Sequence, residues 1–395
     1  MLASDVVIVS AARTAIGNFL GGLSSLSAPE LGSIAIAAAV QRSGVDPGEI
    51  GEVFMGNVLQ AGLGQNPARQ AAMKAGLDQK IPDTTVNMVC GSGLKAVMMA
   101  DMSLRTGDSE VAVAGGMESM SNAPYLLQKA RQGYRMGPQT AEDVMIKDGL
   151  WCAFVDAHMG ITAENVAEKF HVTRQEQDEF SALSQEKAYH AIETERFKDE
   201  IVPVFIPQKK GDPKRMDTDE FPRPGTTVEV LAKLRPAFKQ GGTVTAGNAS
   251  GLNDGAAALV LTRGDKAQSL GLHPMARIVS YASVGLDPAY MGLGPIDATR
   301  KALRKANLDL SQIDLVEVNE AFASQSIVVL NELGLDWSRV NVNGGAVALG
   351  HPIGASGSRI LVTLLYEMEK RDLHLGLATL CIGGGQGVAM IVERI

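Results

Sequence analysis

Two cysteines and a histidine lie in glycine-rich segments of this 395-residue chain and could together transfer an acyl group. Cys90 lies in VCGSGLK (89–95), where an apolar strand pattern changes to a helical one. Cys381 lies in CIGGG (381–385), at the end of another apolar run, and His351 lies in GHPIGASG (350–357). A thiol at a helix N-terminus, an imidazole and a second thiol are what acyl transfer through a thioester needs. The sequence therefore predicts a thioester-forming enzyme.

The position of Cys90 predicts a reactive thiol. A free thiol has a pKa of about 8.5, and a helix N-terminus with a neighbouring histidine lowers it. Gly91 and Gly93 leave the backbone N–H groups of the first helical turn uncrowded, so these groups could stabilise an oxyanion. The alternative is a buried cysteine that acts as a small hydrophobic residue, as most free cysteines do. The flanking glycines favour the catalytic role.

His351 is predicted to be the base. Gly350, Pro352 and Gly354 indicate a sharp, rigid turn that would hold the imidazole at a fixed angle. A pKa near 6.5 suits a base that takes a thiol proton. A lone histidine is more often structural than catalytic, so this assignment depends on the presence of Cys90.

The surroundings of Cys381 leave other functions open. A redox-sensing disulfide between Cys381 and Cys90 is a second hypothesis. Glycine runs also occur in phosphate-binding loops, but the chain has no G-x-x-x-x-G-K-[ST], and no G-x-G-x-x-G follows the first strand. No metal site is expected, because C-x-x-C, H-E-x-x-H and clustered histidines are missing.

Composition narrows the class of protein. Hydrophobic residues make up 45% and charged residues 20% of the chain, which is ordinary for a globular protein. A net charge of −8 without a basic stripe argues against nucleic acid as a partner. No apolar run reaches the roughly 18 residues that span a membrane, and the first residues read as a strand instead of a targeting segment. Three widely spaced cysteines fit a reducing compartment, so we expect a cytoplasmic protein.

Strand and helix patterns alternate in two parts of the chain, which predicts an α/β protein with a mostly parallel sheet. In the first part we expect strands at 6–10, 52–56, 85–89 and 110–115, and helices at 29–43, 68–75 and 91–105. In the second part we expect strands at 276–281, 314–319, 340–343 and around 378 and 388, and helices at 295–306, 321–333 and 355–370.

The two parts correspond in order, which indicates an internal duplication and two similar domains packed face to face. The region between them is rich in proline and charge, and it contains helix patterns at 163–170 and 174–195. A structureless loop of that length is improbable in a compact protein, so this region should form a subdomain and one wall of the ligand site. The predicted domains are 1–120 with 250–270, the inserted 121–249, and 271–395.

Motifs along the whole chain resemble those of the thiolases, and more closely the short-chain biosynthetic type. They follow the family's order from NVLQAGLGQNPAR (57–69), VCGSGLK, GGMESMS (115–121), HMGITAEN (158–165) and TVTAGNASGLNDGAA (243–257) to NEAF (319–322), VNGG (342–345), GHPIGASG and CIGGG. The resemblance implies the thiolase fold, with two duplicated β/α domains in five layers (αβαβα) and an inserted loop subdomain. It implies acetyl-CoA C-acetyltransferase activity: a ping-pong condensation of two acetyl-CoA to acetoacetyl-CoA and CoA, and the reverse thiolysis.

The resemblance also implies roles for five residues. Cys90 matches the nucleophile that is acetylated, and His351 matches the base that activates it and later helps to bind the thioester oxygen. Cys381 matches the acid/base that deprotonates the second acetyl-CoA and protonates the departing CoA. Asn319 matches the residue that holds a water in the oxyanion hole for the enolate. The backbone N–H groups of Cys90 and Gly383 match a second oxyanion hole.

For the substrates, the resemblance implies a tunnel for the pantetheine of CoA. The matching positions are Leu150, His158, Met159, Arg223, Phe238, Ala246, Ser250, Ala321 and Phe322. Arg223 would lie near the nucleotide phosphates, and the apolar members could equally be core residues. CoA is substrate and product, so no cofactor is expected, and a homotetramer built as a dimer of dimers is the family expectation.

The chain departs from the family pattern at three places. Met88 stands where a lysine is common, Val318 replaces a small alanine, and Asp156 with Ala157 precedes His158 where an aromatic residue is more usual. The last change puts the acyl-chain limit in question. Two other functions therefore stay open: a 3-ketoacyl-CoA thiolase of fatty-acid degradation, and a catalytically silent acyl-CoA-binding or redox-sensing relative.

Overall fold

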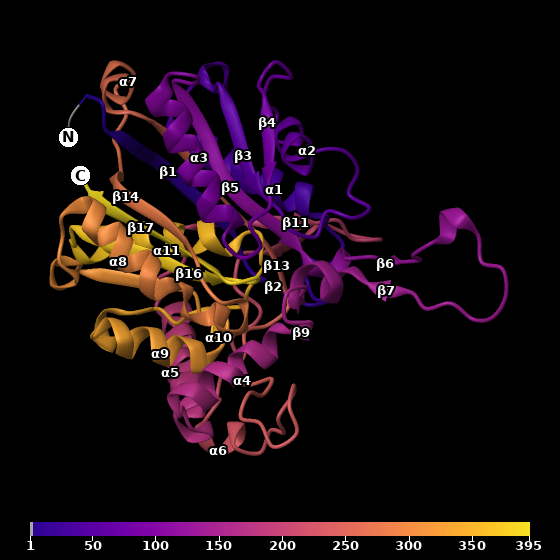
Figure 1. Ribbon diagram of the computed structural model, residues 1–395. Coiled ribbons are helices and arrows are strands. Elements are labelled where there is room, and N and C mark those ends of the chain that lie inside the picture. Colours follow the sequence, from indigo (N-terminus) through magenta and orange to yellow (C-terminus); the bar gives the residue numbers. More distant parts are fainter. Residues whose placement is uncertain (1–2) are drawn as a thin grey trace.

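The computed structural model describes residues 3–395, and an 11-stranded mixed sheet runs through it (Figure 1). The strand order along the sheet is β15-β16-β17-β14-β1-β13-β5-β3-β4, with β10 (Ile201–Val202) added to β1 and β2 (Gly17–Asn18) added to β13. The strands of the first half are β1 (Val6–Thr14), β3 (Glu52–Gly56), β4 (Asp83–Val86), β5 (Val111–Ser119) and β13 (Asn253–Arg263). Those of the second half are β14 (Ala276–Gly285), β15 (Leu315–Val318), β16 (Leu375–Ile382) and β17 (Gln386–Arg394).

The two halves of the sheet repeat one pairing pattern. β3 and β5 are parallel, as are β15 and β16, whereas β5–β13–β1 and β16–β17–β14 are antiparallel. The halves meet where β1 pairs with β14, through Val7 opposite Arg277 and Ile8 opposite Ala276. This repeated pattern agrees with the internal duplication that the sequence indicates.

Helices form three layers around the two halves. The outer helices of the first half are α1 (Ala28–Ser43) and α2 (Pro67–Lys74), and those of the second are α8 (Gly294–Ala306) and α9 (Ala323–Leu333). Between the halves, α3 (Ser92–Thr106) packs against α11 (Ser356–Arg371). Helix, sheet, helix, sheet and helix layers therefore follow one another, which confirms the predicted thiolase-type fold.

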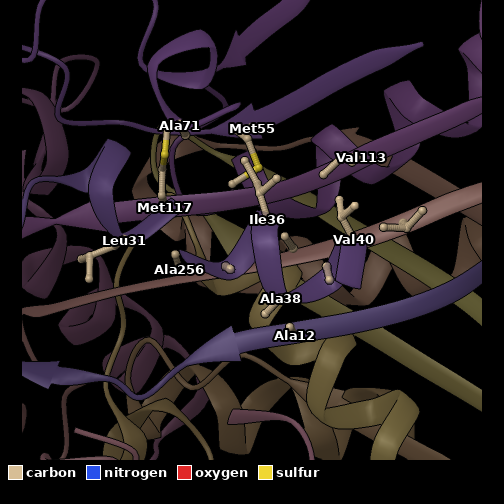
Figure 2. Packing of buried hydrophobic residues seen from close by; sticks show 14 of the residues in the cluster. Ala12, Leu31, Ile36, Ala38, Val40, Met55, Ala71, Val113, Met117 and Ala256 are labelled. Atoms are coloured by element: carbon tan, nitrogen blue, oxygen red, sulfur yellow. The ribbon is translucent and has the colours of Figure 1, made fainter. Parts of the chain in front are cut away.

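Strand residues alternate between these helix layers because successive side chains point to opposite faces of a sheet. In β5, Val111 and Val113 contact the cluster beneath α1, whereas Ala112 and Ala114 contact the cluster around α3 and α11. Figure 2 shows the outer cluster, in which Ile36 and Val40 of α1 lie over the strands beside Met55 and Val113. Both faces of the sheet are thus buried, as the continuous apolar strand patterns predict.

The inserted region forms several small elements beside the two halves. Its helices are α4 (Met159–Phe170), α5 (Arg174–Glu193) and α6 (Val228–Leu231). Its strands are β6 (Tyr125–Leu126), β7 (Glu142–Asp143), β8 (Trp151–Cys152), β9 (Ala157–His158), β10 (Ile201–Val202), β11 (Val204–Ile206) and β12 (Lys214–Met216). The β6–β7 hairpin projects from the body of the molecule (Figure 1).

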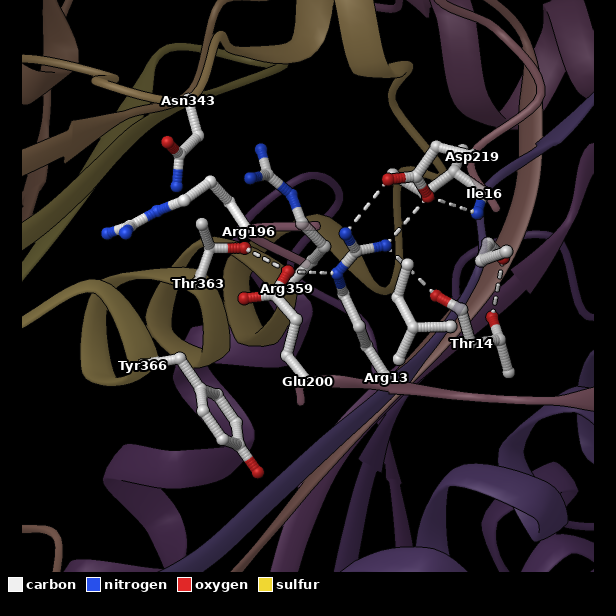
Figure 3. A network of polar contacts seen from close by, with 12 residues as sticks. Arg13, Thr14, Ile16, Arg196, Glu200, Asp219, Asn343, Arg359, Thr363 and Tyr366 are labelled. Atoms are coloured by element: carbon white, nitrogen blue, oxygen red, sulfur yellow. Dashed lines mark hydrogen bonds and ion pairs between the residues drawn. The ribbon is translucent and has the colours of Figure 1, made fainter. Parts of the chain in front are cut away.

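A buried polar network joins the inserted region to both halves (Figure 3). Arg13 of β1 donates from Nε to Glu200 at 2.5 Å and from Nη1 and Nη2 to Asp219 at 2.7 and 2.9 Å. Glu200 also accepts from Thr363 of α11 at 3.1 Å. One arginine in the first half therefore holds two carboxylates of the insertion, and one of these reaches the second half.

The sheet is not mostly parallel as predicted, because β13, β14 and β17 form only antiparallel pairs in it. Most predicted elements lie within a few residues of the observed ones, with two further differences. The strand expected at 340–343 is absent from the described chain, where only Val340 forms a bridge, parallel to Val316. The strand expected at 85–89 ends at Val86, because Val89 adopts a left-handed backbone with φ of 47°. Within residues 3–395, no helix combines the length and apolar character needed to cross a membrane. The predicted domain boundaries stay a prediction.

Candidate active site

A cavity of about 560 Å³ is lined by residues of both halves and of the inserted region. Cys90, His351, Cys381 and Gly383, which are far apart in the sequence, all line it. Asn319 lies beside it, with its Nδ2 atom 3.5 Å from Nε2 of His351. The five residues predicted to carry the chemistry are therefore brought together in one place.

Cys90 lies in a strained turn between β4 and α3. The preceding residue, Val89, has a left-handed backbone that β-branched residues rarely adopt. Ser92 holds this turn, because its hydroxyl accepts from the Met88 N–H at 2.9 Å and donates to the Val89 carbonyl at 2.6 Å. The N-cap residue of α3 is Gly91, which offers no capping side chain, so the positive end of the helix faces the cysteine region.

The protonation state of Cys90 differs from the prediction. Burial, and less strongly the nearby Glu118 carboxylate, raise the pKa of the Cys90 thiol to about 11. The backbone N–H groups of Gly383 and of Cys90 itself lower this pKa without reversing the effect of burial. The predicted lowering of this pKa is therefore wrong, because the effect of burial outweighs that of the backbone N–H groups. A base must take its proton before it can attack.

His351 is held as a neutral imidazole. Its Nδ1 atom lies 2.6 Å from Oγ of Ser356, and that hydroxyl donates to the Pro352 carbonyl at 3.0 Å. Nδ1 therefore carries the hydrogen, and Nε2 keeps a lone pair for a proton. Burial, followed by the positive charge of Arg359, lowers the pKa of His351 to about 3. The imidazole is consequently neutral throughout the physiological pH range. Its pKa lies below the value near 6.5 that the sequence analysis expected, because burial disfavours the charged form.

Cys381 and Gly383 come from the end of β16 and the turn that follows it. Cys381 is buried, and both its burial and the neighbouring Cys90 raise its pKa. Gly383 lies between Met159 and Val89, since an added Cβ would be 3.3 Å from the Met159 sulfur and 3.4 Å from Val89. The Gly383 N–H and the Cys90 N–H both point to the Cys90 sulfur. All three cysteines are free thiols in this structure.

The predicted substrate-binding residues line the same cavity. All nine are present in its wall: Leu150, His158, Met159, Arg223, Phe238, Ala246, Ser250, Ala321 and Phe322. His158 stacks on Phe238 with 4.8 Å between ring centroids and 21° between planes, and Phe238 meets Phe322 edge-on at 6.3 Å. A backbone hydrogen bond connects this wall to the second half, since the Ser250 N–H donates to the Ala321 carbonyl at 3.0 Å. This side of the cavity is apolar and aromatic.

Comparison with known protein families shows which family this chain belongs to. The thiolase N-terminal domain matches residues 6–265, and the thiolase C-terminal domain matches residues 272–394. The chain belongs to the thiolase family. The two matches together span both halves and the insertion.

This thiolase is similar over its full length to acetyl-CoA acetyltransferases. It is 62% identical over 390 residues to that of Pseudomonas aeruginosa, with 99% of each chain covered. It is 58% identical over 392 residues to that of Escherichia coli, again with 99% of each covered. The crystal structure of the Bacillus anthracis acetyl-CoA acetyltransferase superposes with a TM-score of 0.97 at 46% identity, covering 99% of both chains.

Sequence reasoning missed several residues that support the site of this thiolase. Ser356 and Asn253 hold His351, the latter by accepting its backbone N–H at 2.9 Å. Glu118 is buried near Cys90. GGMESMS and GHPIGASG contain Glu118 and Ser356, so the motifs marked the right segments. Which side chains of these segments face the cavity depends on how the two halves meet, and a local sequence pattern carries no information about that contact.

Proposed function

We propose that this thiolase is an acetyl-CoA acetyltransferase that joins two acetyl-CoA into acetoacetyl-CoA and CoA through an acetyl-Cys90 intermediate. The observation that carries the proposal is the meeting of Cys90, His351, Cys381 and Gly383 in one cavity. Full-length similarity to acetyl-CoA acetyltransferases supports it. The reverse reaction, thiolysis of acetoacetyl-CoA, uses the same groups.

In the first half-reaction, Nε2 of His351 takes the thiol proton of Cys90 while the sulfur attacks the carbonyl carbon of acetyl-CoA. The bond between that carbon and the CoA sulfur then breaks. CoA leaves as a thiolate and takes the thiol proton of Cys381, so that Cys381 becomes a thiolate and the acetyl group stays on Cys90. The N–H groups of Cys90 and Gly383 stabilise the oxyanion that forms on the way, because fixed donors in a dry site lower the barrier.

In the second half-reaction, Cys381 as a thiolate takes a proton from the methyl carbon of a second acetyl-CoA. The enolate oxygen accepts a hydrogen bond from Nε2 of His351, which still carries the proton taken from Cys90, and from a water held by Asn319, whose Nδ2 atom lies 3.5 Å from Nε2. The enolate carbon attacks the acetyl carbon on Cys90, and the Cys90 sulfur leaves as a thiolate that takes its proton back from His351 Nε2. CoA is consumed and released in these steps, and no further cofactor takes part.

We assign the CoA pantetheine to the aromatic wall of His158, Phe238 and Phe322, and the nucleotide phosphates to the neighbourhood of Arg223. Arg223 lies at the cavity, and its backbone N–H donates to Gln185 at 2.8 Å. In a protein with a net charge of −8, a local cation is needed to attract an anionic ligand.

The test compares thiolysis of acetoacetyl-CoA with thiolysis of a C8 3-ketoacyl-CoA by the same protein under reducing conditions. The proposal predicts a higher kcat/KM for acetoacetyl-CoA. A preference for the C8 substrate would instead indicate a thiolase of fatty-acid degradation. Absence of thiolysis for both substrates would indicate a silent acyl-CoA-binding relative.

We infer that the protein works as a homotetramer in the cytoplasm. The projecting β6–β7 hairpin supports self-association, because Tyr125, Leu127 and Met136 expose 67%, 55% and 92% of their surfaces on it (Figure 1). Three free thiols suit a reducing compartment. Light scattering of the purified protein should give about four times the mass of one chain. A Met136→Asp variant should dissociate more readily, and a monomeric wild-type protein would contradict the inference.

A further inference from the structure

A buried carboxylate of the first half contacts the loop that carries His351 in the second half. Glu118 is the last residue but one of β5 and is fully buried. Its Oε2 atom accepts from the Gly354 N–H at 2.9 Å, three residues after His351. The same carboxylate accepts from Asn57 Nδ2 at 2.8 Å and from the Val58 and Leu59 N–H groups at 3.1 Å each. Four donors from two halves of the molecule therefore converge on one side chain.

The loop that Glu118 holds is inserted deeply into the first half. A Cβ atom on Gly56 would lie 2.7 Å from the Gly354 carbonyl oxygen, and one on Gly116 would overlap it. A Cβ atom on Gly354 would lie 2.7 Å from Glu118 Oε2 and 2.8 Å from the Met117 carbonyl. Glycines on both sides of this contact leave a slot in which the Gly354 peptide fits, with Glu118 at its end.

The slot also borders the turn of the nucleophile. A Cβ atom on Gly93 would lie 2.7 Å from the Ser358 N atom and 3.2 Å from the Gly354 carbonyl oxygen. Gly93 is three residues after Cys90, and Gly354 is three residues after His351. The contact between the Gly93 segment and the Gly354 segment thus sets the distance between the nucleophile and its base. Glu118 accepts a hydrogen bond from the Gly354 segment.

We propose that Glu118 is a positioning residue for the acetyl transfer, whose carboxylate fixes the His351 loop against the Cys90 turn. It touches neither substrate nor the reacting atoms, and it acts through Gly354. Each of its oxygens accepts two hydrogen bonds, so only the carboxylate form satisfies all four donors. This inference rests on the proposed roles of Cys90 and His351.

The experiment compares wild type, Glu118→Gln, Glu118→Asp and the control Glu367→Gln. Glu367 is a buried carboxylate of α11 that bonds Arg196, Arg371 and Asn343 outside the cavity. For each protein, the measurements are kcat and KM for acetoacetyl-CoA thiolysis, the rate of Cys90 acetylation in a single turnover, the dissociation constant of CoA, and the thermal midpoint.

Glu118→Gln turns an NH2 group toward N–H donors, and Glu118→Asp keeps the charge but is one methylene too short to reach both groups of donors. We expect both variants to lose about 10- to 100-fold in kcat and in acetylation rate, since small displacements of reacting groups cost that much. KM and the CoA dissociation constant should stay within about twofold. Glu367→Gln should lower the thermal midpoint and keep kcat within about twofold.

Several outcomes would overturn the inference. One is an unchanged kcat in both Glu118 variants, and another is full activity in Glu118→Asp, which would show that only charge matters. A third is the unfolding of both variants while Glu367→Gln folds, because Glu118 would then be purely structural. If wild-type protein fails to acetylate Cys90, the proposed function fails instead, so the two failures are distinguishable.

Discussion

At the scale of single residues, the proposed nucleophile Cys90 rests as a protonated thiol. Residue type and flanking glycines indicate Cys90 in the sequence, and the presence of Cys90 in turn favours His351 as the base. The direction of the Cys90 pKa shift was wrong because helix position is a local property, whereas burial depends on which distant segments cover the sulfur. His351 Nε2 is therefore needed to generate the thiolate at the moment of attack.

The pH dependence of Cys90 alkylation tests this protonation state. With a pKa of about 11, the thiolate fraction at pH 7 is small, so the rate with iodoacetamide should rise about tenfold per pH unit from pH 7 to 10. Peptide mapping separates Cys90 from Cys152 and Cys381, which are buried. A rate that levels off below pH 8 would show the low pKa that the sequence had suggested.

A second prediction concerns the hydroxyl that fixes the His351 tautomer. Ser356→Ala removes the acceptor of the Nδ1 hydrogen, so the imidazole can rotate or change tautomer, and we expect kcat to fall about tenfold with KM unchanged. Ser280→Ala is the control, because the buried Ser280 hydroxyl donates to the Ala302 carbonyl at 2.7 Å and neither residue lines the cavity. Steady-state kinetics on both variants decide the matter, and equal losses would contradict the role of Ser356.

At the scale of elements, the β/α alternation was predictable because both faces of the strands are buried and read as apolar runs. The 340–343 segment looked like such a strand, yet only Val340 pairs, parallel to Val316. The chain turns away after Val340: Asn341 bonds back to Val318, Gly344 adopts a left-handed backbone, and the short helix α10 (Ala346–Leu349) follows. Apolar content alone cannot distinguish a full strand from one paired residue.

The start of α4 gives a prediction about substrate binding. An added Cβ at Gly160 would overlap the ring of Phe238, so Gly160→Ala should displace Phe238 from its stack on His158. We expect KM for acetyl-CoA to rise about 5- to 20-fold, which corresponds to the loss of an aromatic contact worth about 1–2 kcal/mol. Gly285→Ala serves as the control, because its Cβ would have one neighbour, at 4.0 Å. An unchanged KM for Gly160→Ala would show that Phe238 does not contribute to substrate binding.

At the scale of the whole molecule, the duplication explains why the active site lies between the halves. Gly56 faces Gly116 in the first half as Val318 faces Thr379 in the second. Asn57 and Asn319 each follow the first residue of their pair, so they correspond. Glu118 and Cys381 each lie two residues after the second residue of their pair, so they correspond as well. At these two corresponding positions, the second half thus holds the catalytic candidates Asn319 and Cys381. The first half holds Asn57 and Glu118, which support the His351 loop. The sequence predicted the duplication, but only the strand register reveals this correspondence.

The Arg13 network predicts how strongly the insertion is anchored. Arg13→Met leaves Glu200 and Asp219 buried without their cation, so the free energy of unfolding should fall by about 3–5 kcal/mol. Lys198→Ala, which breaks an exposed pair with Glu195, should leave the free energy of unfolding almost unchanged. Chemical denaturation measures both. A loss for Arg13→Met as small as that of the control would show that the network does not stabilise the fold.

The central claim is that Cys90 accepts the acetyl group because His351 removes its proton. Mass spectrometry after brief mixing of the intact protein with acetyl-CoA tests it most directly, followed by mapping of the modified peptide. The account predicts an increase of about 42 Da on Cys90 in wild type. The adduct should be missing in Cys90→Ala and form at least about 100-fold more slowly in His351→Ala. An adduct on another residue, or one that forms in His351→Ala at the wild-type rate, would contradict the account.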